Sequence, residues 1–176
     1  MTLAQVGANV VATGSGTIDL TGLSLVVSGG LTNASVQSSL GLIITGPVVD
    51  TPIDIYTGFT GPMSFGNSPS GVPGLTSASS GSGNIVEIIG AFNDLAVPSG
   101  YVSGNSLTDT STYDNQTLAS LEATPGIYVW TWGSGADADS FTLDVVAAAV
   151  PEPASLTLFG AGFAGLAFLR RRRRLP

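Results

Sequence analysis

The amino-acid sequence predicts an all-β fold, an antiparallel β-sandwich of which a jelly roll is one arrangement. Short apolar runs with period-two spacing recur along the chain, as expected for half-buried strands. Glycine and proline, 24 and 10 of the 176 residues, supply frequent turns between these runs. No helix of normal length separates the runs, which argues against parallel βαβ units. A chain of this length is expected to hold one such domain and a C-terminal tail.

The first half of the chain contains three predicted strand regions. Apolar and polar residues alternate over residues 18–27, with a break at Thr21-Gly22, and the folded domain is expected to begin near Gly14. A short apolar run covers residues 40–44, and another alternating run covers residues 53–57. These three regions predict the first strands of the sandwich.

The next segment, residues 58–84, is rich in Gly, Ser and Pro and is predicted to be a long loop. Phe59 and Phe65 could hold this loop against the body of the protein. A loop of that length is uncommon in a compact domain unless it has a role or contains a short strand.

The second half is predicted to contain the best-defined strands and one helix. The predicted strands are residues 84–90, residues 95–103 with an interruption at 98–100, and a hairpin of residues 127–132 and 141–145. Residues 114–123 are the one helical candidate, because Leu118 and Leu121 are three apart and Pro125-Gly126 ends the segment.

The predicted hairpin contains the candidate ligand-binding residues Tyr128, Trp130 and Trp132, which share one face of their strand. An exposed row of aromatic rings could stack on sugars. Buried aromatic rings are also a routine component of a sandwich core, and this is the interpretation that we favour.

The charged residues restrict the possible functions. The chain has no His and no Cys, its five basic residues are arginines in the tail, and its 12 acidic residues all precede them. Ser-His-Asp, Cys-His and Ser-Lys catalysis and His/Cys zinc sites are therefore excluded, and an acidic body without cations repels nucleic acid. We expect no enzyme activity, no cofactor and no metal site.

Two pairs of acidic residues are candidate Ca²⁺ ligands. Asp137 and Asp139 lie two apart in the predicted turn of the hairpin, and Asp50 and Asp54 flank Pro52. Neither pair belongs to a loop with ligands at regular spacing, so we expect ordinary solvated carboxylates.

The C-terminal residues form three consecutive blocks. Val150, Pro151, Glu152 and Pro153 come first, an apolar run over residues 154–169 follows, and the blocks end with Arg170, Arg171, Arg172, Arg173 and Arg174. A helix over the apolar run would span about 24 Å at ~1.5 Å per residue, short of the ~30 Å hydrocarbon core of a bilayer. The arginines resist translocation and stay cytoplasmic. The pattern predicts a short transmembrane helix that anchors the chain only temporarily.

This arrangement resembles the PEP-CTERM sorting signal of Gram-negative bacteria, in which Pro-Glu-Pro, a short apolar helix and an Arg cluster follow one another at the C-terminus. The resemblance implies processing by exosortase, a membrane-embedded protease, and export to the cell surface or extracellular matrix after a transient stay in the inner membrane. The same module is also found on some secreted ice-binding proteins, so it implies export and no particular activity.

The predicted organisation has four parts. They are an exported β-sandwich domain over residues 1–146, a linker with the processing motif over 147–153, a transmembrane helix over 154–169 and a cytoplasmic tail over 170–176. Residues 1–5 lack the features of a signal peptide, which export by this route requires. We therefore expect an internal or truncated start, with Ala4-Gln5 as a candidate remnant of a cleavage region; the alternative is that the chain is not exported as written.

The function expected from these features is that of a non-enzymatic surface or matrix protein associated with extracellular polysaccharide and biofilm. The alternative is a specific carbohydrate- or ice-binding module. Ice binding would require a flat, regular array of Thr or similar residues, and none is evident in the sequence. A glycosidase would require two converging carboxylates in a groove.

Overall fold

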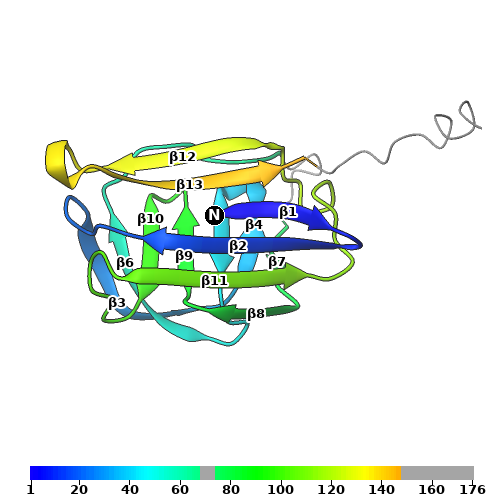
Figure 1. Ribbon diagram of the computed structural model, residues 1–176, viewed down its shortest axis with the longest axis horizontal. Helices are drawn as coiled ribbons and strands as arrows, with labels where there is room; N and C mark the ends of the chain where they lie inside the picture. The colour runs from blue at the N-terminus through cyan, green and yellow to red at the C-terminus, as the bar shows by residue number, and fades with distance from the viewer. Residues whose placement is uncertain (68–73, 148–176) are drawn as a thin grey trace, which may run out of the picture.

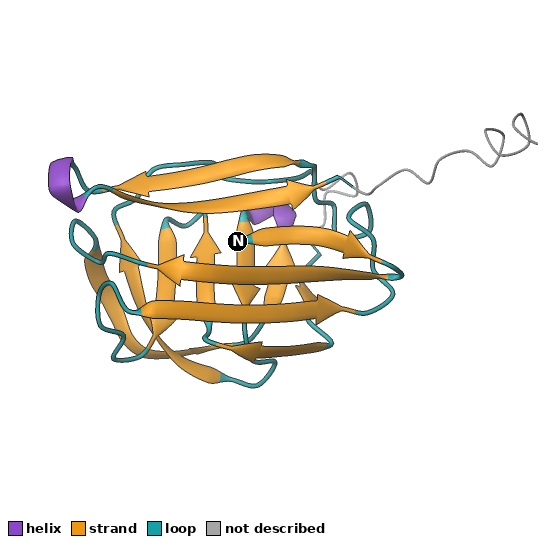
Figure 2. Ribbon diagram, in the orientation of Figure 1, coloured by secondary structure: helices purple, strands orange, loops and turns teal. Residues whose placement is uncertain are grey.

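The computed structural model describes residues 1–67 and 74–147. Over these residues the chain is all β, with two short 3₁₀ turns, η1 (Ser38–Leu40) and η2 (Gly135–Asp137), as Figure 2 shows. The strands are β1 Thr2–Val6, β2 Asn9–Thr17, β3 Ser24–Thr32, β4 Ser35–Gln37, β5 Leu42–Thr45, β6 Thr51–Thr57, β7 Thr76–Ser77, β8 Ser80–Gly83, β9 Val86–Ile89, β10 Asp94–Pro98, β11 Ser106–Tyr113, β12 Gly126–Trp132 and β13 Asp139–Val146.

The strands form two sheets that pack face to face. The front sheet has the order β12-β13-β1-β2-β11-β8, and the back sheet has the order β3-β6-β10-β9-β5-β4-β7. In Figure 1 the strands of the front sheet run across those of the back sheet. The prediction of an all-β sandwich is confirmed.

The topology departs from a simple antiparallel jelly roll. A jelly roll has eight strands in two Greek keys, whereas these sheets have six and seven strands. One pair, β1 with β13, is parallel, and it joins the first strand of the described chain to the last. All the other strand pairs within the described residues are antiparallel.

Most of the predicted strands are present. The hairpin is β12 and β13, the strand over 84–90 is β9, and those over 40–44 and 53–57 correspond to β5 and β6. The region 95–103 contains β10, which ends at Pro98 before the turn at Ser99-Gly100.

Four strands of the front sheet, β1, β2, β8 and β11, were not predicted as strands. Folded structure begins at β1 and not near Gly14, because Thr2–Val6 lies between β13 and β2. Ala4 and Gln5, the predicted remnant of a cleavage region, belong to this strand. The strand predicted over residues 18–27 is only partly present, because residues 18–23 connect β2 to β3 and strand β3 begins at Ser24. Ile18 in this connection is buried.

The loop over residues 58–84 contains two short strands, β7 and β8. Phe59 and Phe65 are buried in the main core, as predicted. Phe65 also receives support from a backbone hydrogen bond, in which its N–H donates to the Ser38 carbonyl. The two rings therefore tie the described part of this loop to the sandwich.

The helix predicted over residues 114–123 is absent, and the segment forms successive turns. Asn115 and Glu122 have positive φ angles of 55°, which interrupt a right-handed helix at both ends. Leu118 and Leu121, whose spacing suggested the helix, are buried in the core from these turns. One pair of apolar residues three positions apart is compatible with a compact turn as well as with a helix.

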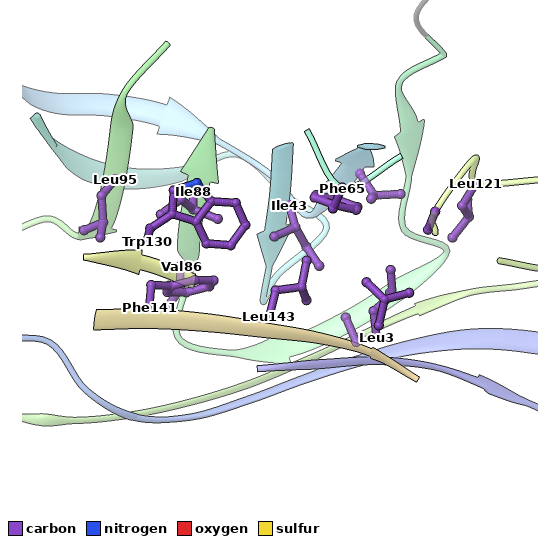
Figure 3. Close-up of a cluster of buried hydrophobic side chains, with 14 of the residues drawn as sticks. Leu3, Ile43, Phe65, Val86, Ile88, Leu95, Leu121, Trp130, Phe141 and Leu143 are labelled. Carbon is purple, nitrogen blue, oxygen red and sulfur yellow. The ribbon is translucent and has the colours of Figure 1, made fainter. Parts of the chain in front are cut away.

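The main core lies between the two sheets. Figure 3 shows Trp130 and Phe141 of the front sheet meeting Val86 and Ile88 of the back sheet, with Leu143 beside Ile43. The Trp130 and Phe141 rings meet edge to face with centroids 5.8 Å apart. Burial of this apolar surface is the main stabilising contribution to the fold.

A second, smaller apolar cluster lies on the other side of the back sheet. Val86 and Ile88 of β9 point to the main core, so the alternating Ile85 and Ile89 point the opposite way. The buried members of the cluster are Leu42, Ile44, Ile53, Ile85 and Ala96. The back sheet is thus apolar on both faces, which leaves the front sheet as the layer with a polar outer surface.

The transmembrane helix and the cytoplasmic tail predicted over residues 154–176 lie outside the described residues. Among the residues that are described, no helix is long and apolar enough to cross a membrane.

Candidate functional site

The outer surface of the front sheet is covered with hydroxyl groups. Along each of its strands the inward side chains enter the core, and the alternating outward side chains are mostly Thr and Ser. We call this surface the hydroxyl face; it comprises Thr2, Thr13, Ser15, Thr17, Ser80, Ser82, Ser106, Thr108, Thr110, Thr112, Ser140 and Thr142. Threonine suits this place because its branched side chain packs well on a pleated surface.

The pairing register aligns these hydroxyl groups in rows across the strands. Thr2 pairs with Thr13, Thr13 with Thr110, and Thr110 with Ser82, so one row crosses four strands. Neighbouring rows are formed by the pairs Ser15–Thr108, Thr17–Ser106 and Thr112–Ser80. In Figure 1, the axes of β13, β1, β2 and β11 are nearly aligned across the front of the molecule. The rows therefore build an array across β1, β2, β11 and β8, and a cavity lined by Ser15, Thr17, Ser140 and Thr142 separates it from the hydroxyl groups of β13. This array was not predicted from the sequence.

Charge is almost absent from this array. Of the acidic residues that the structure describes, only Asp144 points outward from the front sheet, beside Thr2. The aromatic residues of β12 and β13 point inward, and the margin of the face is formed by the aliphatic side chains of Ala4, Val6, Val11, Ile127, Val129 and Val146. The surface is thus hydroxyl-rich and partly bordered by methyl groups, and its charged groups are Asp144 and the Met1 ammonium, which donates to the Thr142 carbonyl.

The aromatic residues predicted as a possible sugar platform belong to the core. Trp130 is 0% exposed and Trp132 is 4% exposed, and Tyr128 packs against the same cluster. Both indole N–H groups are satisfied: Trp130 Nε1 donates to the Pro62 carbonyl at 2.8 Å, and Trp132 Nε1 donates to the Asp19 carbonyl at 2.7 Å. The three residues therefore form no exposed stacking surface, as the favoured interpretation expected.

Asp139 has a structural role in the turn region of the hairpin. Its carboxylate accepts hydrogen bonds from the backbone N–H groups of Asp19 at 2.7 Å and of Ser140 at 2.7 Å. It therefore fixes the loop after β2 to the start of β13. Asp137 is exposed in η2. Within the described residues, no group of three or more His, Cys, Asp and Glu side chains is placed to hold a metal ion.

Asp54 is the most heavily hydrogen-bonded carboxylate of the described chain. It accepts bonds from the Gly100 N–H at 2.9 Å, the Ser28 hydroxyl at 2.8 Å, the Ser99 hydroxyl at 2.9 Å and the Gly29 N–H at 3.1 Å. These donors, the Gly100 N–H first among them, lower the pKa of Asp54 to about 2. The carboxylate joins β3 to the turn after β10, so it stabilises one end of the back sheet.

Asp54→Asn is expected to lower stability at neutral pH and to remove part of the acid dependence of folding. An amide turns its NH₂ group toward one of the four donors, which then loses its acceptor. The unfolded pKa is about 3.9, and the folded pKa is lower, so the contribution of Asp54 is present above pH ~4 and is lost as the pH falls through about 2.

Urea unfolding midpoints at pH 7, 4 and 2.5 would measure this effect. Asp114→Asn, a change at an exposed turn carboxylate, is the matched control and should retain the acid dependence of the wild type. Equal acid dependence in wild type and Asp54→Asn would show that the hydrogen bonds to Asp54 do not contribute to stability.

Asp109 is buried between the sheets, next to a cavity of about 90 Å³ that opens at the N-terminal end of β1. Gly14, which pairs with Asp109, has no side chain, and this leaves room for the carboxyl group over its backbone. Burial raises the pKa of Asp109. Asp109 is the one carboxyl group among the described residues that line this cavity, whereas glycoside hydrolysis needs a pair.

The predicted processing residues Val150, Pro151, Glu152 and Pro153, and the arginines at positions 170–174, lie outside the described residues. The last described strand, β13, ends at Val146, immediately before this part of the chain.

Comparison with known proteins identifies the C-terminal segment. The family model of the PEP-CTERM protein-sorting motif matches residues 149–174. Searches of curated proteins and of solved structures found no match to the chain. The match covers both the Pro-Glu-Pro sequence and the Arg cluster, as the resemblance implied. Residues 149–174 are therefore a PEP-CTERM protein-sorting motif, which implies export and exosortase as the processing partner.

Proposed function

We propose that this is a non-enzymatic protein of the cell surface or extracellular matrix of a Gram-negative bacterium, where it is associated with extracellular polysaccharide. The observation that carries this proposal is the sorting motif over residues 149–174. The motif implies export and temporary anchoring through the apolar segment, followed by release of the β-domain. The domain then serves as a structural component of the matrix.

The chemistry of the domain supports a role without catalysis. The body has no Lys, His or Cys from which a nucleophile and base could be assembled. The carboxylates that were candidates for other roles, Asp54 and Asp139, are engaged in fixing loops. The surplus of acidic side chains favours solubility outside the cell.

The proposal is tested by fractionating a producing culture into cytoplasm, membrane, matrix and medium. We expect the body of the protein in the matrix fraction and its release by enzymes that degrade the polysaccharide. Deletion of residues 149–176 is the control and should abolish retention at the membrane during export. Accumulation of the unmodified protein in the cytoplasm would contradict the proposal.

Processing itself is expected to remove the tail near Pro151-Glu152-Pro153. Intact-mass spectrometry of the matrix form should show loss of the segment from about Ala154 onward, because exosortase recognises the motif and an anchor of this length is weak. Glu152→Ala is expected to retain the full tail and stay in the membrane fraction. Recovery of the intact Arg cluster on wild-type matrix protein would argue against processing.

A further inference from the structure

The front sheet has an unpaired gap beside the first residue of β1. Pairing of β1 with β2 ends at Thr2–Thr13, and pairing of β1 with β13 ends at Thr2–Asp144. Both neighbouring strands continue past this point, as the position of the N-terminus between β13 and β2 in Figure 1 shows. Residues 15–17 and 140–142 thus lie on opposite sides of the cavity of about 90 Å³, with no described strand between them.

The gap has the dimensions of one strand. β1 holds β2 and β13 two strand spacings apart, which is about 9.6 Å at ~4.8 Å per spacing. Residues 15–17 and 140–142 give the gap a length of about 10 Å at ~3.3 Å per residue. Its far end is closed where the Asp19 N–H donates to the Asp139 carboxylate at 2.7 Å. An extended segment of about three residues therefore matches the gap in width and length.

The main chain of Met1 is already directed along this gap. The Asp144 N–H donates to the Met1 carbonyl at 3.0 Å, and the Met1 amino group donates to the Thr142 carbonyl at 2.8 Å. Met1 thus continues the ladder between β1 and β13. Because a strand residue directs its N–H and C=O to the same side, the Thr142 N–H also faces the gap. A chain joined to the Met1 nitrogen enters the gap in register with residues 140–142.

The lining of the gap determines which side chains fit there. Leu3 is buried and Met1 packs against the main core, so alternation directs the second residue before Met1 inward. This inward position faces the buried side chains of Val86 and Phe141 and the carboxyl group of Asp109. A small, uncharged residue suits it, whereas Asp109 repels a second carboxylate. The first and third residues before Met1 point outward, among the hydroxyl groups of the face.

We propose that the gap between β2 and β13 is the docking site of a chain segment directly N-terminal to Met1, which lengthens β1 by about three residues parallel to β13. The segment pairs with both neighbouring strands and completes the front sheet. A second copy is a poorer occupant, because two acidic domains whose described residues contain no Lys or Arg repel each other. The inference goes beyond the proposed matrix function, since it depends on strand pairing and not on polysaccharide.

The first experiment adds Thr-Val-Thr before Met1 of the full-length chain, released from a cleavable fusion, and measures urea unfolding and amide hydrogen exchange. The expected result is a higher unfolding midpoint than that of the unextended chain. Exchange of the Thr142 N–H should slow by about ten-fold or more, because this group then donates to the added strand.

The matched control is Gly-Pro-Gly, an extension of the same length that is unsuited to a central strand because proline has no N–H. It should leave the unfolding midpoint and the exchange of the Thr142 N–H unchanged. Thr-Asp-Thr differs from Thr-Val-Thr only at the inward position. It should unfold at a lower urea concentration than Thr-Val-Thr, because the added carboxylate lies against Asp109.

The second experiment determines the first residue of the protein isolated from its producer, by mass spectrometry of the N-terminal peptide. Residues that precede Met1 are expected. Three results would overturn the proposal: a natural protein that begins at Met1 or later, equal midpoints and equal Thr142 exchange for Thr-Val-Thr and Gly-Pro-Gly, or protection of the Thr142 N–H that appears only on dimerisation. Loss of polysaccharide association alone would contradict the proposed function and leave the docking site standing.

Discussion

Trp130→Ala is expected to destabilise the domain by about 3–5 kcal/mol, the usual cost of truncating a large buried aromatic side chain. The indole is 0% exposed, its Nε1 donates to the Pro62 carbonyl, and its ring meets Phe141 edge to face. The substitution removes the buried indole together with its hydrogen bond and its contact with Phe141, and it leaves a cavity between the sheets. Since domains of this size are stable by about 5–15 kcal/mol, a large fraction of the variant could unfold at 37 °C.

Urea unfolding followed by tryptophan fluorescence and circular dichroism would measure the loss. Val129→Ala is the matched control, because Val129 is the neighbour of Trp130 on β12 and its side chain is 40% exposed and points outward. The control is expected to lose well under half as much stability. If Trp130→Ala unfolded at the same urea concentration as wild type, the placement of this strand in the core would be wrong.

Gly81→Ala is expected to destabilise the domain by about 1–3 kcal/mol or more, the range for overpacking a tightly packed interior. Gly81 points inward from β8, and a Cβ atom there would overlap the Gly46 carbonyl oxygen of the back sheet. Backbone on both sides of the contact limits relaxation. The two sheets approach closely at this point because neither position carries a side chain.

Ser80→Ala and Ser82→Ala are the controls for this effect, because both exposed side chains lie on the same strand and point to the hydroxyl face. Each is expected to change the unfolding midpoint only slightly. Equal midpoints for Gly81→Ala and the two serine variants would show that β8 is free to move away from the back sheet.

The sequence was sufficient to predict strands whose buried positions are large and apolar. β12 and β13 alternate aromatic or aliphatic residues with small polar ones, and both were predicted almost to their ends. β2 and β11 were missed because their inward positions include Gly14, Asp109 and Ser111, which give no apolar period. These small or polar residues are accommodated in the interior because the two sheets approach closely there. The close approach depends on packing between segments distant in the sequence.

The hydroxyl face was missed for a related reason. A period-two pattern of hydroxyl residues is present in the sequence at Thr13, Ser15 and Thr17, and again from Ser106 to Thr112. A search for alternating hydroxyl residues, and not only apolar ones, would have found both strands. Their alignment with Thr2 and Ser82 depends on strand order and register. The register pairs residues more than 90 positions apart, such as Thr13 and Thr110, so local sequence patterns do not predict it.

Under the proposed route of export, the parallel pair of β1 and β13 sets the order of folding and release. Its register places Thr2 beside Asp144, so the front sheet is completed only when the last strand of the body is available. Contacts so distant along the chain form slowly, because a long loop must close first. β13 directly precedes the sorting motif at 149–174. Under the proposed route of export from the N-terminal end, the motif reaches the bilayer as β13 emerges, and tethering there would give the sandwich time to close before the proposed processing.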